Sequence, residues 1–517
     1  MRRTIDSEMF KSTIALASIN ASSKKKSSLP LGKPREGSGA RKSSKIVILR
    51  FVVSALACGF LGFLIGCNRE PAEAEIQIPP LGFVPPVEQR SGDPQAGYDA
   101  LVNQPYIRCG MPYSAYRGST REPSPDQLLP GRNSENRELP YFLTSHTNAD
   151  NVRIISSNCL LCHAGYFNDQ LIIGLGDEFL DFTGDASINA EQVGAYIEDE
   201  HEARAWKKWA DRIEVIAPYI RTDTVGINPA VNLTVALMAH RDPETLAWSD
   251  APLMEPPPEK PLPVSVPPWW RMKKKHALFY NTEGRGDHSR IMILAATLCT
   301  DSLEEAREID RLSADIRAYL VSLKAPSYPF AIDAELAARG SDVFRQNCTR
   351  CHGSYGTQAS YPNLVLDYRE IGTDPELAKF STAPENLRFV RWFNRSFYGE
   401  NSRGEAAPGY IAPPLDGIWA TAPFFHNASV PTIEGVLQSA KRPKFWQYPE
   451  SASDFDPDTL GLKHRVLDYG KAGSTDPSQQ KRIYDTTAPG YSNAGHTFGD
   501  HLNPDQRRAL IEYLKTL

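Results

Sequence analysis

Two Cys-Xaa-Xaa-Cys-His motifs constrain this chain more than any other feature of its sequence. The six residues are Cys159, Cys162 and His163 in the first motif and Cys348, Cys351 and His352 in the second. One helical turn brings both thiols of a motif to the same side, where they can form thioethers with the two vinyl groups of a haem, and it turns the adjacent histidine toward the iron. The sequence therefore predicts two covalently bound haems c.

Zinc binding and redox-active dithiols are the alternative interpretations of these cysteines. A shared zinc ion would need the two cysteine pairs to meet, yet 185 residues separate Cys162 from Cys348. Compact zinc ribbons have much shorter spacings, and here each pair is followed directly by histidine. Haem attachment is therefore the favoured interpretation.

The second ligand of the C-terminal iron is expected to be a histidine. All seven methionines lie at or before Met292, so a local His/Met pair is not available to this haem. The histidines beyond His352 are His426, His464, His496 and His501. Irregular Gly-, Asn- and Pro-rich surroundings favour His426 and His496, whereas charged neighbours predict a surface position for the other two.

The N-terminal haem has no obvious second ligand. Residues 164–200 contain neither histidine nor methionine. The next histidine, His201, lies in a charged helical pattern that predicts solvent exposure. Tyr166 or a residue from a distant loop remains an alternative. The sequence favours an open iron, which can bind peroxide or oxygen, whereas an iron with two protein ligands mainly transfers electrons.

The first 67 residues resemble a bacterial export signal. A basic extension precedes an apolar run that ends in Leu64-Ile65-Gly66-Cys67, which is similar to a lipoprotein cleavage box. Cleavage and lipidation at Cys67 are expected, with an uncleaved membrane anchor as the alternative. The protein is therefore expected in the periplasm or on the cell surface. There Cys109 and Cys299 either form a disulfide or remain two buried thiols.

The rest of the chain divides into three predicted segments. A Pro-rich tether (68–95) precedes an N-terminal haem domain (96–325) and a C-terminal cytochrome c-like haem domain (326–517). Helical periodicity marks "EEAREIDRLSADIRAYLVSL" and the two segments that flank the second domain, whereas residues 251–270 are Pro-rich and irregular. The expected fold is mainly α, with two cytochrome c-like domains and long irregular loops.

The charge distribution limits the choice of partners. Residues 1–67 carry 12 Lys/Arg against 3 Asp/Glu, and the remainder carries 45 against 59. An acidic body argues against nucleic-acid binding. It suits a small basic electron donor, such as a soluble cytochrome c or a cupredoxin-like protein.

Several longer segments resemble known dihaem proteins. "PPLDGIWATAPFFHNASVPTIEGVL" resembles a segment of bacterial dihaem cytochrome c peroxidases and their MauG-like relatives. "PPWWRMKKKHALFY", "KRPKFW" and "SNAGHTFG" are more specifically similar to the RoxA-like branch, which includes dihaem rubber oxygenases. The resemblance extends from Gln95 to Leu517.

This resemblance implies roles for individual residues. It places His426 near the haem rather than on the iron, and it puts Ala440 at the position of the peroxidases' distal ligand. The RoxA-like "GH" context implies His496 as the partner of His352, with His426 as the second choice. An aromatic residue between the haems corresponds to Trp270 or its neighbour Trp269.

The expected function is a peroxidase-type oxidoreductase. By the resemblance, the N-terminal haem on His163 binds peroxide, and the C-terminal haem supplies electrons. Glu178 and Asp169 are candidates for the acid–base group that peroxide cleavage needs, and Arg285 is a candidate partner of a haem propionate. The alternatives are a RoxA-like oxygenase acting on an apolar substrate and a non-catalytic electron carrier or haem sensor.

Overall fold

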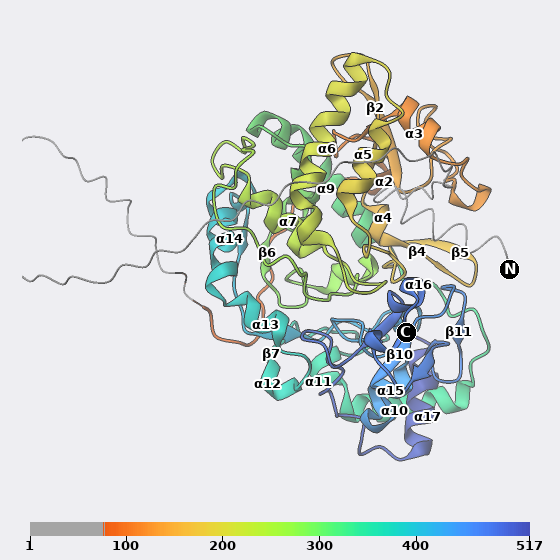
Figure 1. The fold of residues 1–517 in the computed structure, drawn as a ribbon. Helices are drawn as coiled ribbons and strands as arrows, with labels where there is room; N and C mark the ends of the chain where they lie inside the picture. Colours follow the sequence, from red (N-terminus) through yellow and green to blue (C-terminus); the bar gives the residue numbers. More distant parts are fainter. Residues whose placement is uncertain (1–75, 77) are drawn as a thin grey trace, which may run out of the picture. The chain divides into compact units, whose positions relative to one another are not determined.

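A computed structural model describes residue 76 and residues 78–517 of the chain (Figure 1). The predicted signal segment, the lipidation site Cys67 and the first part of the Pro-rich tether (68–75, with 77) lie outside the described residues. Residues 78–517 form one compact unit. Within residues 78–517, no helix is both long and apolar enough to cross a bilayer.

Helices are the main regular elements, and the strands are short. The helices and 3-10 turns before residue 326 are α2 (Pro94–Asn103), α3 (Tyr113–Ser119), η1 (Pro125–Gln127), α4 (Leu160–His163), α5 (Ala186–Gly194), α6 (Glu200–Ile220), α7 (Ala230–Ala239), η2 (Trp269–Lys274), α8 (His288–Met292), η3 (Ile293–Leu298) and α9 (Leu303–Ser322). Those after it are α10 (Ala334–Asn347), α11 (Thr349–His352), α12 (Tyr368–Ile371), α13 (Glu376–Ser381), α14 (Pro384–Arg395), η4 (Phe397–Gly399), η5 (Ile418–Ala420), α15 (Ile433–Leu437), η6 (Ser439–Lys441), η7 (Lys471–Gly473), α16 (Pro477–Gln480) and α17 (Pro504–Leu514).

The strands form small antiparallel sheets. They are β1 (Met111–Pro112), β2 (Leu143–Thr147), β3 (Arg153–Ser157), β4 (Ala164–Phe167), β5 (Gln170–Ile173), β6 (Gly284–Gly286), β7 (Val365–Asp367), β8 (Ser402–Gly404), β9 (Gly409–Ile411), β10 (Phe445–Gln447), β11 (Phe455–Asp456), β12 (Gly461–Leu462), β13 (Arg465–Leu467) and β14 (Ile483–Asp485). The three-stranded sheets have the orders β1-β3-β2 and β13-β10-β14. The other strands pair as β4-β5, β6-β8, β7-β9 and β11-β12.

The helices predicted from periodicity are present. Ser302 caps the N-terminus of helix α9, because its hydroxyl accepts a hydrogen bond from the backbone nitrogen of Glu305. The helix buries Ile309, Ile316 and Leu320 on one face. The Pro-rich segment 251–270 is irregular as predicted, except that its last two residues begin η2.

Helices α10 and α17 pack closely beside the second haem motif. A Cβ at Gly340 would lie 1.9 Å from the carbonyl oxygen of Ala509, so glycine is what allows this approach. Phe344 of α10 and Leu510 and Leu514 of α17 are buried in the same core. These buried positions recur at the helical spacing that marked the two segments in the sequence.

Two hydrophobic cores interleave the two predicted haem domains. The larger core is built mainly before residue 325 but includes Phe389, Trp392 and Phe393 of α14. The second core is built mainly after residue 325 but includes Phe167 and Trp270. The domain boundary near residue 325 stays a prediction, because each core contains residues from both sides of it.

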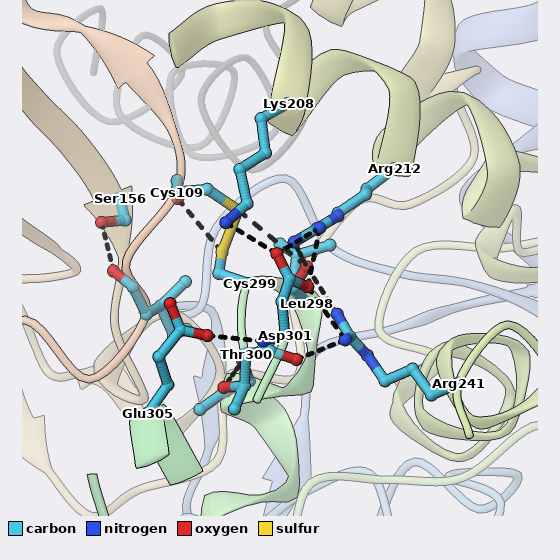
Figure 2. Close-up of a disulfide and its surroundings, with 12 residues drawn as sticks. Cys109, Ser156, Lys208, Arg212, Arg241, Leu298, Cys299, Thr300, Asp301 and Glu305 are labelled. Atoms are coloured by element: carbon cyan, nitrogen blue, oxygen red, sulfur yellow. Dashed lines mark hydrogen bonds and ion pairs between the residues drawn. A yellow bond between two sulfur atoms is a disulfide. The ribbon is translucent and has the colours of Figure 1, made fainter. Parts of the chain in front are cut away.

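A disulfide between Cys109 and Cys299 links β1 to the start of α9 (Figure 2). Of the two states that the sequence left open, the structure therefore has the disulfide. Beside it, the side chains of Lys208, Arg212 and Arg241 converge on Asp301 at 2.7 to 3.0 Å. Burial by itself would raise the pKa of Asp301, but hydrogen bonds from Arg212 and Lys208 hold it below its usual value.

Replacing both cysteines by serine should lower the free energy of unfolding by about 2–5 kcal/mol, because the bond restricts the unfolded chain over a separation of 190 residues. Thermal unfolding of the haem-loaded protein, with and without reductant, measures this. Reduced wild-type protein should match the Cys109→Ser/Cys299→Ser variant, since thioether bonds to haem are not reduced. Equal melting temperatures for the oxidised wild type and the variant would contradict the prediction.

Candidate functional site

The C-terminal motif has the geometry that haem attachment needs. Cys348 ends α10, and the turn of α11 brings the backbone nitrogens of Cys351 and His352 to 3.2 and 3.0 Å from the Cys348 carbonyl oxygen. Cys348 and Cys351 are not joined in a disulfide. The turn therefore presents two thiols and one imidazole together, as covalent attachment requires.

A backbone carbonyl orients His352. Its Nδ1 donates a hydrogen bond of 2.9 Å to the carbonyl oxygen of Pro413, which belongs to the "PPLDG" sequence. A histidine whose Nδ1 donates in this way presents its Nε2 lone pair to a metal, and the hydrogen bond fixes the ring plane. His352 is therefore arranged as an iron ligand.

His496 faces His352 across the C-terminal site. The ring centroids are 6.3 Å apart, with an interplanar angle of 63°. An iron held by two opposed imidazoles separates their centroids by about 6 Å, because each metal–nitrogen bond is roughly 2 Å long and each nitrogen lies about 1 Å from its ring centre. The Nδ1 atom of His496 is buried and completes no hydrogen bond within residues 78–517, although the carbonyl of Val436 partly opposes the lowering of the His496 pKa by burial. The pair therefore fits a bis-histidine haem.

The loop that carries His496 is held by Arg442 of the "KRPKFW" segment. The guanidinium of Arg442 donates to the carbonyl oxygens of Asn493, Gly495 and His496 at 2.7, 2.6 and 3.1 Å. The backbone nitrogen of His496 also bonds the carbonyl of Ile371 at 2.8 Å. His496 has a positive φ of 44°, which is uncommon outside glycine and asparagine. These contacts keep the histidine aimed at His352 despite its unusual backbone.

His426 occupies a different environment. Its ring is buried and stacks on Tyr410 at 4.3 Å between centroids, with Tyr280 further away at 6.4 Å. Burial lowers the pKa of His426 to about 3. In the part of the chain that the structure describes, its ring makes no contact with the rings of His352 or His496. The geometry thus favours His496 over His426 as the second ligand.

The N-terminal motif forms a similar turn with a different support for its histidine. The backbone nitrogen of His163 bonds the carbonyl of Cys159 at 3.1 Å, and the β4–β5 hairpin follows. The imidazole of His163 stacks on Trp269, with centroids 4.7 Å apart and planes inclined by 20°. Burial lowers the pKa of His163, and the nearby carbonyl of Pro267 partly opposes this lowering. The Nδ1 atom of His163 nevertheless completes no hydrogen bond within residues 78–517. An aromatic contact therefore orients His163, whereas a hydrogen bond orients His352.

Residues 78–517 provide no histidine ring opposite His163 that would match the position of His496 opposite His352. His201 is exposed, as predicted, and its Nδ1 contacts Arg204 at 2.9 Å. The hydroxyl of Tyr166 bonds Asp126 on the protein surface. The two haem sites therefore differ in the described residues available for a second iron ligand.

The two acidic candidates do not lie together. Asp169 is exposed and accepts a hydrogen bond of 2.6 Å from Ser453. Glu178 is buried, accepts a hydrogen bond of 3.0 Å from the backbone of Val266, and has a pKa that burial raises well above its usual value. Val266 directly precedes Pro267 beside the proximal histidine, so Glu178 contacts the segment that supports His163.

The two tryptophans of η2 have separate positions. Trp269 stacks on His163, whereas Trp270 is fully buried and donates from its indole nitrogen to the carbonyl of Asp416 at 2.8 Å. A Cβ at Gly417 would lie 3.1 Å from the Trp270 ring, which therefore packs directly against the second half of the chain. The adjacent Arg271 also bonds the Asp416 carbonyl, at 3.0 Å. Sequence reasoning missed Arg271 and the contact of Trp269 with His163, although their place after Pro267-Pro268 was a usable signal.

A comparison with protein families gives a partial match. Residues 409–447 match the family model described as "RoxA-like, cytochrome c-like". This segment is similar to a RoxA-like cytochrome c domain. It contains His426, together with Pro413 and Arg442, which hold His352 and the loop of His496, and the match supports haem c as the cofactor. It supports the RoxA-like branch of the resemblance rather than the peroxidase and MauG branch.

Two similar proteins come from Sinorhizobium fredii (strain NBRC 101917 / NGR234). The uncharacterized protein y4iJ is 33% identical over 262 residues, which cover 38% of this chain and 41% of that protein. The uncharacterized protein y4iM is 31% identical over 248 residues, covering 40% of this chain and 55% of that protein. The chain thus spans less than two thirds of the length of either relative.

The zinc alternative finds no support in the side-chain geometry. Within residues 78–517, no three histidine, cysteine, aspartate or glutamate side chains gather as ligands for a bare metal ion. The two cysteine pairs therefore do not converge on one site, as a shared zinc ion would require.

Replacing His496 by alanine should convert the C-terminal haem from a low-spin to a high-spin ferric state, because the iron loses its second imidazole. Electron paramagnetic resonance and the visible spectrum of the oxidised protein measure the change. The matched control is His426→Ala, which should keep the low-spin signal. A low-spin signal that survives in His496→Ala and disappears in His426→Ala would reverse the assignment.

Proposed function

We propose that this protein is a dihaem c-type oxidoreductase in which the N-terminal haem binds the oxidant and the C-terminal haem transfers electrons. The observation that carries the proposal is the difference between the two sites. His352 has a facing partner in His496 at 6.3 Å, whereas His163 is backed by Trp269. A bis-histidine iron favours electron transfer, and an iron with one protein ligand can bind peroxide or oxygen.

The preferred activity is of the peroxidase type. A haem iron with a free position supplies the electrons and the coordination site for cleaving a peroxide bond. His163 would hold this iron, and the stack on Trp269 would restrict rotation of its imidazole. The Pro413 carbonyl and the Arg442-bound loop would hold His352 and His496 at the other haem. Trp270 packs between residues of both halves and is the proposed aromatic contact for electron transfer between the haems.

Export and a lipid anchor at Cys67 belong to the same proposal. An oxidising compartment suits both haem c attachment and the Cys109–Cys299 disulfide. The acidic body outside residues 1–67 suits a small basic electron donor, such as a soluble cytochrome c or a cupredoxin-like protein.

An oxygenase acting on an apolar substrate is the second candidate. The RoxA-like match at residues 409–447 favours it. A cavity of about 300 Å³ adds support, because its walls include Val231, Leu262, Val264 and Leu377, with Lys260 and Lys379 also lining it. Val264 lies three residues before Pro267, so the same chain segment reaches both the cavity and the support of His163.

Electron paramagnetic resonance of the oxidised protein with and without cyanide tests the open-site proposal. One high-spin signal that cyanide converts to low spin, beside one unresponsive low-spin signal, is expected because only the N-terminal iron has a free position. Two unresponsive low-spin signals would instead identify an electron carrier or haem sensor. A pyridine haemochrome assay should give two haems per chain.

The choice between the two enzymes rests on the oxidant that is consumed. With a reduced small cytochrome c as donor, a peroxidase oxidises the donor in proportion to added hydrogen peroxide and leaves dissolved oxygen unchanged. An oxygenase consumes oxygen only when an apolar substrate, such as a polyisoprene emulsion, is present. His163→Ala is the control that should abolish either activity.

A further inference from the structure

A group of basic side chains near the end of η2 forms no salt bridge with a carboxylate of residues 78–517, although Asp416 and Asp287 act on its members at longer range. It consists of Arg271, Lys275, Arg317 on α9, and His288 on α8. Arg271 and His288 are almost completely buried, with 6% and 1% of their surface exposed. Burial and the charge of Arg271 together lower the pKa of Lys275 to about 8. Burial also lowers the pKa of His288, and the charges of Arg317 and Lys275 add to that effect, whereas Asp287 opposes it. Lys275 thus lies near Arg271 and His288, and Arg317 lies near His288.

The hydrogen bonds of these side chains are incomplete. Both ring nitrogens of His288 and the Nε atom of Arg317 are buried and complete no hydrogen bond within residues 78–517. The backbone of His276 lies near His288 and partly opposes the lowering of its pKa. Lys275 reaches only the carbonyl of Phe279, at 3.4 Å. Arg271 bonds the Asp416 carbonyl and, at 3.4 Å, the Thr421 hydroxyl.

The nearest carboxylates are bound to other cations. Asp416 pairs with Lys274 at 2.8 Å, and Asp287 pairs with Arg90 at 2.5 Å. Several other buried arginines have carboxylate partners, including Arg212 with Asp301 and Arg285 with Glu405, whereas Arg132 bonds backbone carbonyls. Arg285, the propionate candidate from the sequence, is therefore already neutralised.

Buried cations without anions are unfavourable, because the protein interior solvates charge poorly. A cluster of this kind is expected to bind an anion that supplies several acceptor oxygens. Carboxylates fit this requirement, since two oxygens can accept from a guanidinium, an ammonium and an imidazole N–H together.

Arg271 connects the cluster to both haem-binding segments. Two residues before Arg271, Trp269 stacks on His163. Arg271 itself bonds Asp416, in the same loop as Pro413, whose carbonyl orients His352, and the charge of Arg271 contributes to lowering the pKa of His352. A haem c carries its thioether bonds on one edge and two propionate carboxylates on the opposite edge, so a haem bound at either motif would supply carboxylates.

We propose that Arg271, Lys275, His288 and Arg317 form a carboxylate-binding cluster that receives haem propionates and thereby raises the reduction potential of the haem it contacts. The proposal rests on the bound haems of the proposed function but not on peroxide or oxygen chemistry. A diffusible oxyanion is the other source of the same ligand chemistry, and the experiment separates the two.

The test is spectroelectrochemistry of the haem-loaded full chain carrying Lys275→Met or Arg317→Met. Each variant should keep two haems per chain and should shift at least one haem to a lower reduction potential, because removing a nearby positive charge stabilises the ferric state. The matched control is Lys273→Met, in the same segment, since Lys273 is exposed and reaches only the Leu323 carbonyl at 3.5 Å. The conservative variant Lys275→Arg should restore the wild-type potential.

Wild-type potentials in both variants would overturn the proposal. A second result would also overturn it: the wild-type potential depends on the concentration of inorganic phosphate, and the Lys275→Met variant loses that dependence. The ligand would then be a diffusible anion. Two cyanide-insensitive haems with lowered potentials in the variants would remove the proposed enzyme function and leave the propionate cluster standing.

Discussion

The single helical turn of each Cys-Xaa-Xaa-Cys-His motif is the constraint on which the other features of this protein depend. It places two thiols and one imidazole together and so determines one face of each iron site. The opposite face is left to loops that are distant in sequence. The residues that fold over the second face therefore decide whether an iron held by each motif would bind an oxidant or only transfer electrons.

The two proximal histidines have different supports. His352 donates to the Pro413 carbonyl at 2.9 Å, whereas His163 stacks on Trp269. In both sites the supporting residue belongs to or follows a Pro-Pro pair, whose fixed backbone holds a carbonyl or a ring in place. A hydrogen bond to Nδ1 makes an imidazole a more basic ligand, so the two proximal histidines would differ in the electron density that they donate to a bound iron.

The two halves of the chain are joined by shared apolar packing and by the turn η2. Helix α14 inserts aromatic side chains into the first core, and Trp270 belongs to the second core. The short turn η2 carries Trp269, Trp270 and Arg271 in sequence, so it contacts His163 at one end and the His352 loop at the other. Movement of one haem site relative to the other would disrupt this turn.

The sequence by itself determined the two haem motifs, helices α9, α10 and α17, and the irregular Pro-rich segment. These features depend on spacings within a few residues, where backbone geometry leaves little choice. Only the tertiary structure paired Cys109 with Cys299 and distinguished Trp269 from Trp270. It also placed His496, which the RoxA-like resemblance had implied, opposite His352 in preference to the alternative His426. Each of these contacts joins residues that are distant in sequence or have similar neighbours, so packing and long-range hydrogen bonds such as those of Arg442 decided them.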